Sequence, residues 1–522
     1  MNPFVTRDRR HYRRWMNILP ALFIPGSAHF VSGRKKVGLA WFAAALVLGG
    51  VAMALVLSPQ SSYTIPGGFH WLDLVCCAVG IGQIVDACRR PIRRIGLKGW
   101  AAFLAVFVVI FLVPALAVRH FAVEAFRIPT SAMEPTLIGK EVGGDRILVD
   151  KLRYRRQPPQ RWDIVVFKID KMRINYHRAA LMRRPTPPDI APLPNGTITY
   201  PGRAKTKYVN YVKRLVGLPG DSIQFKNGDV FIKGKICRKP EDVEEALLVP
   251  VAGVDPGPPS DESFFEDWRP TGAAQVRFEN GVLHLPGSRA ATGAGVRYSH
   301  PIEDRVETDE RTTRRREERG NLNIVGDLKL RLRLRHVGGA GRLVGRLEEN
   351  GSVYEFALPL GGLEGGARLH WNGKEVAQAA PFPAIGEHEL TFSNIDARVT
   401  LRIDGKALIR YANDAPSEAQ LNRVVDVPGY AGRSGVEFAA HKCDVDVRAV
   451  SLWRDVYYTS DPALHKFAVR APFTLAPDEY FAMGDNSPNS FDSRNWGVVK
   501  KASIVGKVFY VFAPADRKKW IE

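Results

Sequence analysis

Long apolar runs occupy the first quarter of the chain and distinguish it from the rest. Residues 37–58 carry no charged side chain, and as a helix they would extend about 33 Å, enough to cross a bilayer core. Residues 100–118 form a second uncharged run. Residues 69–86 are also apolar, although Asp73 inside a bilayer would have to face a partner or reach the interface. We predict three membrane-spanning helices within a membrane region at residues 1–119.

Basic residues are distributed unevenly around these three runs. The chain before residue 37 and the loop at residues 87–99 contain many, whereas the loop at residues 59–68 contains none. Because positively charged loops stay in the cytoplasm, the chain should cross in the order in, out, in, out. Everything after about residue 119 is then expected on the extracytoplasmic side. The basic residues concerned are Arg7, Arg9, Arg10, Arg13, Arg14, Arg34, Lys35, Lys36, Arg89, Arg90, Arg93, Arg94 and Lys98.

From about residue 260 the pattern changes to short stretches in which apolar and polar residues alternate. Such alternation is typical of strands with one buried face, and Asp404-Gly405 between two stretches is typical of a hairpin turn. Their number and spacing predict an inserted antiparallel β-sandwich at residues 260–454. Residues 399–408 with the later strand 435–438 resemble concanavalin-type jelly rolls. The predicted strands are Asn323–Leu334, Ser352–Leu358, Glu389–Phe392, Ala397–Ile403, Ala407–Tyr411, Gly435–Phe438 and Val445–Leu452.

The composition is that of a folded protein, with 45% hydrophobic and 25% charged residues. The formal net charge of +20 would suit a nucleic-acid-binding protein. However, the N-terminal basic clusters flank apolar runs, and no nucleic-acid-binding motif accompanies the basic residues elsewhere. We therefore expect no nucleic acid partner.

The five cysteines lack the spacing of a metal site. Cys76, Cys77 and Cys88 lie in or beside an apolar segment, where cysteine behaves as a small hydrophobic residue. Cys237 and Cys443 could form a disulfide if both are extracytoplasmic, or they could be two unrelated thiols. No metal ion is expected.

Four blocks of sequence follow the last apolar run: Phe126–Leu137, Gly144–Lys151 with Asp163–Phe167, Tyr211–Asp221 and Gly484–Gly497. In this order they closely resemble the type I signal peptidases. These are serine/lysine endopeptidases, of the bacterial leader peptidase type, that remove signal peptides. The resemblance implies an all-β catalytic domain at residues 120–240 and 455–522, no cofactor, and a multi-pass protein of the bacterial inner membrane.

Lys213 has the sequence context that a neutral lysine requires. A serine hydroxyl is a weak nucleophile and needs a base, and lysine can be that base only when burial lowers its pKa. Lys213 lies in an alternating run, where it should share an apolar face with Tyr211 and Leu215 while Arg214 points the other way. Without the family resemblance, a single lysine in a strand would be read as an exposed edge residue.

The resemblance also implies roles for other residues. Ser490 matches the family serine that orients the lysine, and Asp492 and Arg494 match a neighbouring pair that holds the site together. Thr130 matches the position whose hydroxyl can contribute to an oxyanion hole. A preprotein with small side chains at the first and third positions before the cut would lie extended along the strand edge near Phe126–Pro129. Its expected contacts are Ile128, Pro129 and Met133.

The chain departs from the family pattern at the nucleophile. The family has a serine directly before Met133, and here that position is Ala132. In one hypothesis the loop is shifted by one residue, so that Ser131 attacks with Lys213 as its base; Pro129 and Pro135 favour the irregular structure that this requires. In the other, the site is inactive and only binds extended peptides. Trp162, where the family commonly has Gly, is a smaller departure.

Three functional hypotheses follow. The first is a membrane-bound serine endopeptidase that acts on signal peptides at the bilayer surface. The second is a catalytically silent peptide-binding or envelope accessory protein on the same fold. The third is an envelope binding protein whose main function is carried by the insert, which could bind a glycan, a cell-wall polymer or a protein, or could act as a spacer.

Overall fold

A computed structural model of the chain supports two compact units, Met1–Val123 and Glu124–Glu522. The second unit is described from its first residue, Glu124, and includes both of the regions that carry the signal-peptidase-like blocks. The described residues are 122–140, 143–181, 207–253, 261–272, 275–287, 293–304, 322–381, 386–413 and 434–521, with residues 34–56 and a few isolated residues before 86 and between 191 and 199.

In the first unit, helix α4 (Lys35–Val56) nearly coincides with the first predicted span. Strands β1 (Thr64–Ile65) and β2 (Phe69–His70) pair antiparallel, so the second predicted helix does not begin at residue 69. The rest of that run and the run at residues 100–118 lie outside the described residues, apart from isolated positions. Within the described part of the chain, no helix combines the length and hydropathy needed to cross a membrane.

The sheet that carries the signal-peptidase-like blocks is buried on both faces. Along β5 the side chains of Ile164 and Val166 enter one hydrophobic cluster, and those of Val165 and Phe167 enter another. An uninterrupted apolar run is what a strand covered on both sides requires. The order is β29-β28-β8-β5-β30-β4-β3, with β31 paired to β30. The strands are β3 (Val123–Arg127), β4 (Arg146–Asp150), β5 (Ile164–Asp170), β8 (Tyr208–Gly217), β28 (Glu479–Met483), β29 (Val499–Lys500), β30 (Ile504–Ala513) and β31 (Lys519–Trp520).

Short helices and a small sheet surround this sheet. Helix α9 (Lys171–Leu181) is fastened to α14 (Ser493–Trp496), because Arg173 donates to the carbonyls of Trp496 and Val498 at 2.7 and 2.8 Å. The remaining elements are α8 (Arg153–Arg156), β6 (Ala191–Pro192), β7 (Ile198–Thr199), β9 (Ser222–Lys226), β10 (Asp229–Ile232), β11 (Lys235–Ile236), α10 (Glu241–Leu247), β27 (Phe473–Thr474), η2 (Ser131–Met133), η4 (Ser487–Asn489), η5 (Lys501–Ser503) and η6 (Ala515–Arg517), with the small sheet in the order β11-β10-β9-β27.

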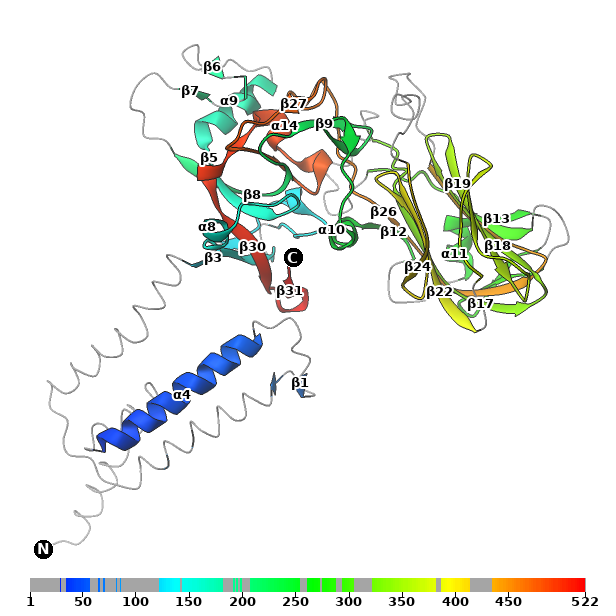
Figure 1. Ribbon diagram of the computed structural model, residues 1–522, viewed down its shortest axis with the longest axis horizontal. Helices are drawn as coiled ribbons and strands as arrows, with labels where there is room; N and C mark the ends of the chain where they lie inside the picture. The colour runs from blue at the N-terminus through cyan, green and yellow to red at the C-terminus, as the bar shows by residue number, and fades with distance from the viewer. Residues whose placement is uncertain are drawn as a thin grey trace, which may run out of the picture. The chain divides into compact units, whose positions relative to one another are not determined.

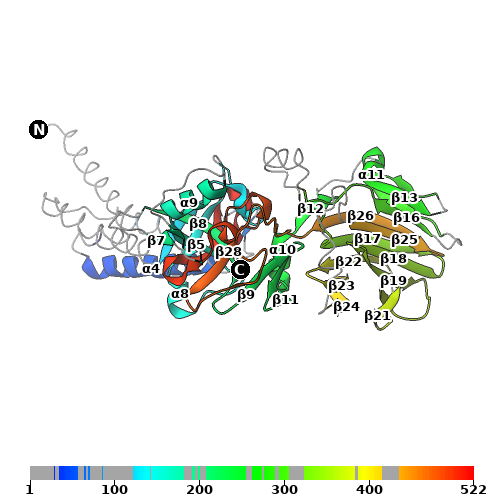
Figure 2. The same cartoon turned by 90° about the horizontal axis from the view of Figure 1, so that it is seen from above.

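Two further antiparallel sheets are built from residues between 249 and 454, and they lie face to face (Figures 1 and 2). Because both are larger than the small sheet, they are called the larger sheets. One has the order β14-β15-β26-β17-β22-β23-β24, with β12 paired to β26, and the other has the order β13-β16-β25-β18-β19-β20-β21. Their elements are β12 (Val249–Ala252), α11 (Asp261–Asp267), β13 (Trp268–Gly272), β14 (Arg277–Glu279), β15 (Val282–Leu285), β16 (Ala294–Tyr298), β17 (Leu328–Gly338), β18 (Gly341–Glu349), β19 (Ser352–Leu360), β20 (Arg368–Trp371), β21 (Lys374–Gln378), β22 (Glu387–Ile395), β23 (Arg398–Ile403), β24 (Lys406–Ala412), β25 (Ser434–His441) and β26 (Asp444–Arg454).

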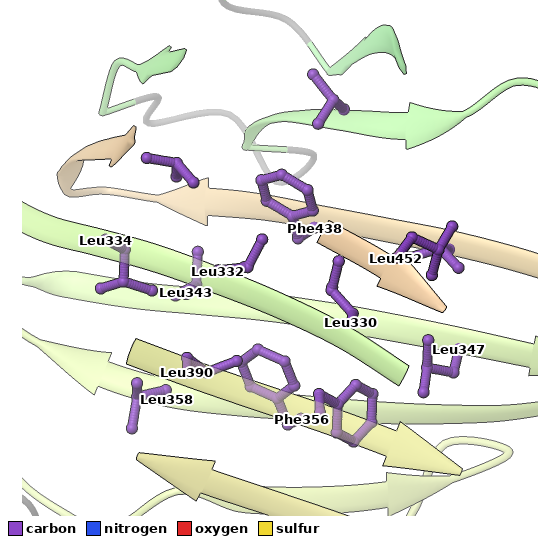
Figure 3. Close-up of a cluster of buried hydrophobic side chains, with 14 of the residues drawn as sticks. Leu330, Leu332, Leu334, Leu343, Leu347, Phe356, Leu358, Leu390, Phe438 and Leu452 are labelled. Atoms are coloured by element: carbon purple, nitrogen blue, oxygen red, sulfur yellow. The ribbon is translucent and has the colours of Figure 1, made fainter. Parts of the chain in front are cut away.

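These two sheets share one hydrophobic core, which Figure 3 shows in close-up. Strand β17 illustrates why the sequence forms it: Leu328, Leu330 and Leu332 are fully buried, while the residues between them point away from the core. Phe356 of β19 meets Phe392 of β22 edge to face, with ring centroids 4.9 Å apart. The alternating pattern therefore fills the space between the sheets from both sides.

All seven strands expected from alternation overlap observed strands. The first lies further along the chain than expected, because β17 runs from Leu328 to Gly338 rather than from Asn323 to Leu334. Asp404 and Gly405 form the turn between β23 and β24, both with positive φ (50° and 75°), as a tight hairpin turn requires. Cys237 and Cys443 are free thiols, so the possible disulfide between them is not formed.

Replacing Phe356 with Ala tests this core. Phe356 is fully buried, and its removal should lower the free energy of unfolding by about 3–5 kcal/mol because it leaves a cavity between the sheets. Chemical denaturation of the purified protein measures this loss. Val337→Ala is the matched control, since Val337 is 54% exposed and its truncation should change stability by less than about 0.5 kcal/mol. Equal losses in both variants would contradict the assignment of this core.

Candidate active site

Lys213 lies on β8, in the sheet that is buried on both faces. It is paired in register with Val165 of β5, which belongs to the same hydrophobic cluster as Leu215, and Tyr211 packs against that cluster. The expected shared face is therefore present. The lysine is only 2% exposed, and its Nζ donates a hydrogen bond of 2.9 Å to Oγ of Ser490. The amine that the sequence singled out is thus buried beside a hydroxyl.

Burial lowers the pKa of Lys213 to about 8, even though the nearby carboxylates of Asp492 and Asp485 favour the charged form. The physical cause is loss of hydration, which costs an ammonium more than a neutral amine. A substantial fraction of Lys213 is therefore neutral in mildly alkaline solution. A neutral amine in contact with a hydroxyl is able to accept a proton.

The loop that supplies Ser490 passes unusually close to the loop that contains Ala132. A Cβ atom added to Gly484 would lie 2.2 Å from Oγ of Ser490 and 2.4 Å from the carbonyl oxygen of Ala132. Asn486 also donates from its backbone to that carbonyl at 3.3 Å. Glycine at position 484 is therefore what allows these two loops to meet beside Lys213.

Asp492 and Arg494 hold the Ser490 loop in place. Both are fully buried, and two nitrogens of Arg494 donate to the two oxygens of Asp492 at 2.9 and 2.7 Å. Arg494 also donates to the carbonyls of Thr459 and Ser487, at 2.7 and 2.8 Å. Burial alone would raise the pKa of Asp492, but the charge and hydrogen bonds of Arg494 hold it below its usual value. Asp492 thus remains a carboxylate.

A second buried ion pair, absent from the sequence-based site, lies behind the first. Arg214 forms two hydrogen bonds of 2.8 Å with the two carboxylate oxygens of Asp485, and Thr136 donates to the same carboxylate at 2.6 Å. Arg214 does point away from Lys213's face, as expected, but it is 3% exposed rather than solvated. Both Arg214 and Asp485 lie within the motif blocks, directly after Lys213 and Gly484. Sequence periodicity did not predict that these two side chains are buried, and for that reason the pair was not included in the predicted site.

Ser131 and Ala132 lie in the short helix η2, and they face different partners. Oγ of Ser131 accepts a hydrogen bond of 2.6 Å from the side chain of Asn489. Among the described contacts none joins Ser131 to Lys213, whose hydrogen bond goes to Ser490. The backbone of Ala132, by contrast, lies next to Gly484 and Ser490. Asn489 is a further site residue that the sequence did not identify.

The remaining predicted residues fall into two groups. Ile128 and Met133 are buried in a hydrophobic cluster beneath the loop, with 3% and 2% exposure, so their side chains are not available to a ligand. Pro129 and Thr130 are exposed, and the Thr130 side chain does not cap η2. Strand β3, which leads into this loop, is the last strand of its sheet within the described residues. Its outer edge can therefore accept an added strand.

Trp162 has a backbone conformation that explains the glycine usual at this position. Its φ is 75°, in the left-handed region that glycine adopts without cost and bulky residues rarely enter. Its carbonyl accepts a hydrogen bond of 3.0 Å from Arg214, and its ring is buried. The burial of the ring and the hydrogen bond from Arg214 therefore stabilise a left-handed backbone conformation at a residue that is not glycine.

A groove of about 720 Å³ adjoins the site. One wall is formed by the loop after η2, with Glu134, Pro135 and Ile138, and by Asn486 and Pro488. The opposite wall comes from the larger sheets and their connections, and includes Tyr298, His300, Ile302, Val251 and Tyr457. The groove is therefore lined both by the loops of the site and by residues of the larger sheets.

A family model described as signal peptidase, peptidase S26, matches residues 99–254 and 399–513, slightly more than half of the chain. The chain belongs to this family. The match is interrupted at residues 255–398, where most strands of the larger sheets lie, which agrees with a large insertion in the signal peptidase sequence. The exact domain boundaries expected from the sequence remain predictions.

Curated relatives of this family member include signal peptidases of several bacteria. The probable signal peptidase I-2 of Synechocystis sp. is 32% identical over 122 residues, 23% of this chain and 41% of the relative. Signal peptidase I of Pseudomonas aeruginosa is 34% identical over 143 residues, 25% of this chain and 36% of the relative. The chain thus spans less than half the length of these relatives.

Solved structures similar to part of the chain include the carbohydrate binding module CBM66 from Bacillus subtilis. It is 10% identical and covers 36% of this chain and 94% of its own, with a TM-score of 0.23. A likeness at this level carries no argument about fold or ligand.

Gly484→Ala tests the close approach of the two site loops. The added methyl group would force Ser490 and the backbone of Ala132 apart, and we expect a loss of about 1–3 kcal/mol in the free energy of unfolding. Thermal unfolding monitored by circular dichroism measures it. Gly338→Ala is the control, because a Cβ there has its nearest neighbour at 3.5 Å. An unchanged Gly484→Ala protein would mean that the loops do not meet.

Lys213→Met tests the cost of burying the amine. With a pKa lowered to about 8, the charged lysine destabilises the fold by up to about 3 kcal/mol, and Met removes that cost. The gain should be complete below pH 8 and should vanish as pH rises toward the pKa of an unfolded lysine, because neutral Lys213 carries no such penalty. Unfolding free energies measured across pH test this. Lys168→Met, at an exposed position of β5, should show no such dependence.

Proposed function

We propose that this protein is a membrane-anchored serine endopeptidase that removes signal peptides from exported preproteins. The observation that carries the proposal is the buried Lys213, whose lowered pKa and contact with Ser490 suit a general base. Membership of the signal peptidase family supports the reaction class. The apolar runs and the placement of basic residues support an anchor in the bacterial inner membrane, with the catalytic domain outside the cytoplasm.

In the proposed reaction, neutral Lys213 takes the proton of the Ser131 hydroxyl as its oxygen attacks the scissile carbonyl carbon. Lys213 then gives this proton to the leaving amine as the C–N bond breaks, and water hydrolyses the resulting ester with Lys213 again as base. Ser490 orients the amine, and the Thr130 hydroxyl contributes to binding the oxyanion. For this, the Ser131 side chain has to turn away from Asn489, its partner in the resting site.

The proposed substrate binds as an extended strand along β3 and Pro129. The outer edge of β3 supports this arrangement, since backbone groups there can pair with a peptide. Because the side chains of Ile128 and Met133 are buried, their contribution would come from backbone groups and from the shape of the loop. The groove beside Pro135 and Tyr298 would then receive the chain after the cut.

We further propose that residues 260–454 form a jelly-roll-like β-sandwich domain inserted into the catalytic domain. The two face-to-face sheets and their common core support this. A glycan or a protein of the cell envelope as its ligand remains a hypothesis from the sequence.

One observation favours the alternative of a silent peptide-binding protein. The backbone of Ala132 lies next to Ser490, the partner of Lys213, whereas the Ser131 hydroxyl is bonded to Asn489. Ala132 itself has no hydroxyl at the position where the family has its nucleophile. Binding of a signal peptide without its cleavage would be the signature of that alternative.

Cleavage of a preprotein by the purified, detergent-solubilised protein tests the proposal. Ser131→Ala and Lys213→Ala should each reduce kcat/KM by at least about 10³-fold, because the nucleophile and its base act as a unit. Ser503→Ala, outside the site, should leave cleavage unchanged. Cleavage that survives Ser131→Ala but is lost in Ser490→Ala would transfer the role of nucleophile to Ser490. If the wild-type protein binds signal peptide and never cuts it, the silent alternative is correct.

The pH dependence provides an independent test of Lys213. Because only the neutral amine can act as base, kcat/KM should rise about tenfold per pH unit below about pH 8 and level off above it. Rates of preprotein cleavage at saturating and low substrate, measured across pH, give this profile. A profile already flat at neutral pH would show that another group is the base.

A further inference from the structure

Two adjacent residues, Asn489 and Ser490, contact both members of the proposed catalytic pair. Ser490 accepts a hydrogen bond of 2.9 Å from Nζ of Lys213. Asn489, the last residue of η4, donates from Nδ2 to Oγ of Ser131 at 2.6 Å. The proposed function gives Ser490 the task of orienting the amine, whereas it gives the Asn489 amide no task.

The backbone around Asn489 is held in place by hydrogen bonds. Its N–H donates to the carbonyl of Asn486 at 3.0 Å, and the N–H of Asn486 donates to the carbonyl of Ala132 at 3.3 Å. Arg494 donates to the hydroxyl and to the carbonyl of Ser487, at 2.7 and 2.8 Å. The Asn489 amide is therefore positioned next to η2 before any substrate binds. Electrostatic stabilisation of a transition state depends on donors that are preorganised in this way.

Turning the Ser131 side chain vacates a position beside this amide. In the proposed reaction Ser131 turns from Asn489 toward Lys213 and the scissile carbonyl. A change of staggered rotamer moves Oγ by about the distance that separates two oxygens on one tetrahedral carbon. The position that Oγ leaves, 2.6 Å from Nδ2 of Asn489, can therefore receive the carbonyl oxygen of the substrate. Ser131 and Asn489 are both partly exposed, so a peptide can reach them.

The oxygen at this position gains negative charge during the reaction. As Oγ of Ser131 bonds to the carbonyl carbon, Lys213 takes the hydroxyl proton and the π electron pair of the carbonyl moves onto its oxygen. A side-chain amide nitrogen has two N–H donors and carries no charge. The Asn489 amide thus has the chemistry of an oxyanion donor, and it comes from a different loop than the Thr130 hydroxyl.

We propose that Asn489 is a catalytic residue whose amide donates to the Ser131 hydroxyl in the resting site and to the oxyanion once Ser131 has attacked. This inference rests on the proposed function, in which Ser131 is the nucleophile. The turn of Ser131 then exchanges one partner of the amide for another, so the amide is not left without an acceptor. The resting contact between Asn489 and Ser131 is in this way part of the reaction.

Cleavage of a preprotein by the full-length, detergent-solubilised protein tests the role of Asn489. Asn489→Ala should lower kcat about 10²–10³-fold and change KM less than about threefold, because the lost interaction is made only in the transition state. Initial rates over a range of preprotein concentrations give the two constants separately. Asn210→Ala, at an exposed position of β8, is the control and should cleave as the wild type does.

Asn489→Asp separates an oxyanion donor from a residue that only positions Ser131. The carboxylate has nearly the shape of the amide and can accept a hydrogen bond from the Ser131 hydroxyl, so a positioning role would survive the change. A carboxylate cannot donate to an oxyanion, and its charge repels one. We therefore expect kcat to fall at least as far as in Asn489→Ala. Both variants should still bind uncleaved signal peptide, which shows that they are folded.

The outcomes distinguish this inference from the proposed function. If the wild type cleaves and Asn489→Ala keeps the wild-type kcat, or if Asn489→Asp cleaves faster than Asn489→Ala, Asn489 is not the oxyanion donor and the proposed function stands. If the wild type binds signal peptide and never cuts it, the proposed function fails and the role of Asn489 fails with it.

Discussion

Burial of the Lys213 amine is the constraint on which the catalytic part of this fold depends. A charged amine inside a sheet is unfavourable unless something compensates, and here Ser490 contacts it while Asp492 and Asp485 lie near enough to act on its charge. Both carboxylates form ion pairs with arginines, Asp492 with Arg494 and Asp485 with Arg214, and no described hydrogen bond or ion pair joins either of them to the lysine. Burial outweighs the effect of these two carboxylates, which favour the charged amine, so Lys213 is partly neutral.

The two buried ion pairs also explain how chain segments far apart in sequence meet at one point. Arg494 binds the carbonyls of Thr459 and Ser487, so the loop carrying Ser490 cannot move independently of the chain that returns from the insertion. Arg214, next to Lys213 on β8, binds Asp485 at the other end of the same loop. Breaking such a pair leaves a buried charge without a partner, which costs several kcal/mol. The hydroxyl and the amine are therefore fixed relative to each other by groups that need not take part in any reaction.

The larger sheets have a hydrophobic core of their own, because they bury their apolar faces against each other. Charged groups join them to the part of the chain that precedes them. Arg398 of β23 donates to Glu244 and to the carbonyl of Lys239.

The sequence by itself determined part of the strand pattern and the chemistry of single residues. Alternation located seven strands between residues 249 and 454 and missed the other eight described there, β12 to β16, β18, β20 and β21. The motif blocks identified Lys213, Ser490, Asp492 and Arg494, because local residue order is a property of the chain alone. Only the tertiary structure decided which partners those residues have. It directed Ser131 to Asn489, placed Ala132 beside Ser490, buried Ile128 and Met133, and added Arg214 with Asp485 to the site. The sequence could not show that Asp229 and Asp396 are neighbours for the same reason: they are separated by more than 160 residues, and only the packing of separate sheets brings oxygens of the two side chains within 4.8 Å.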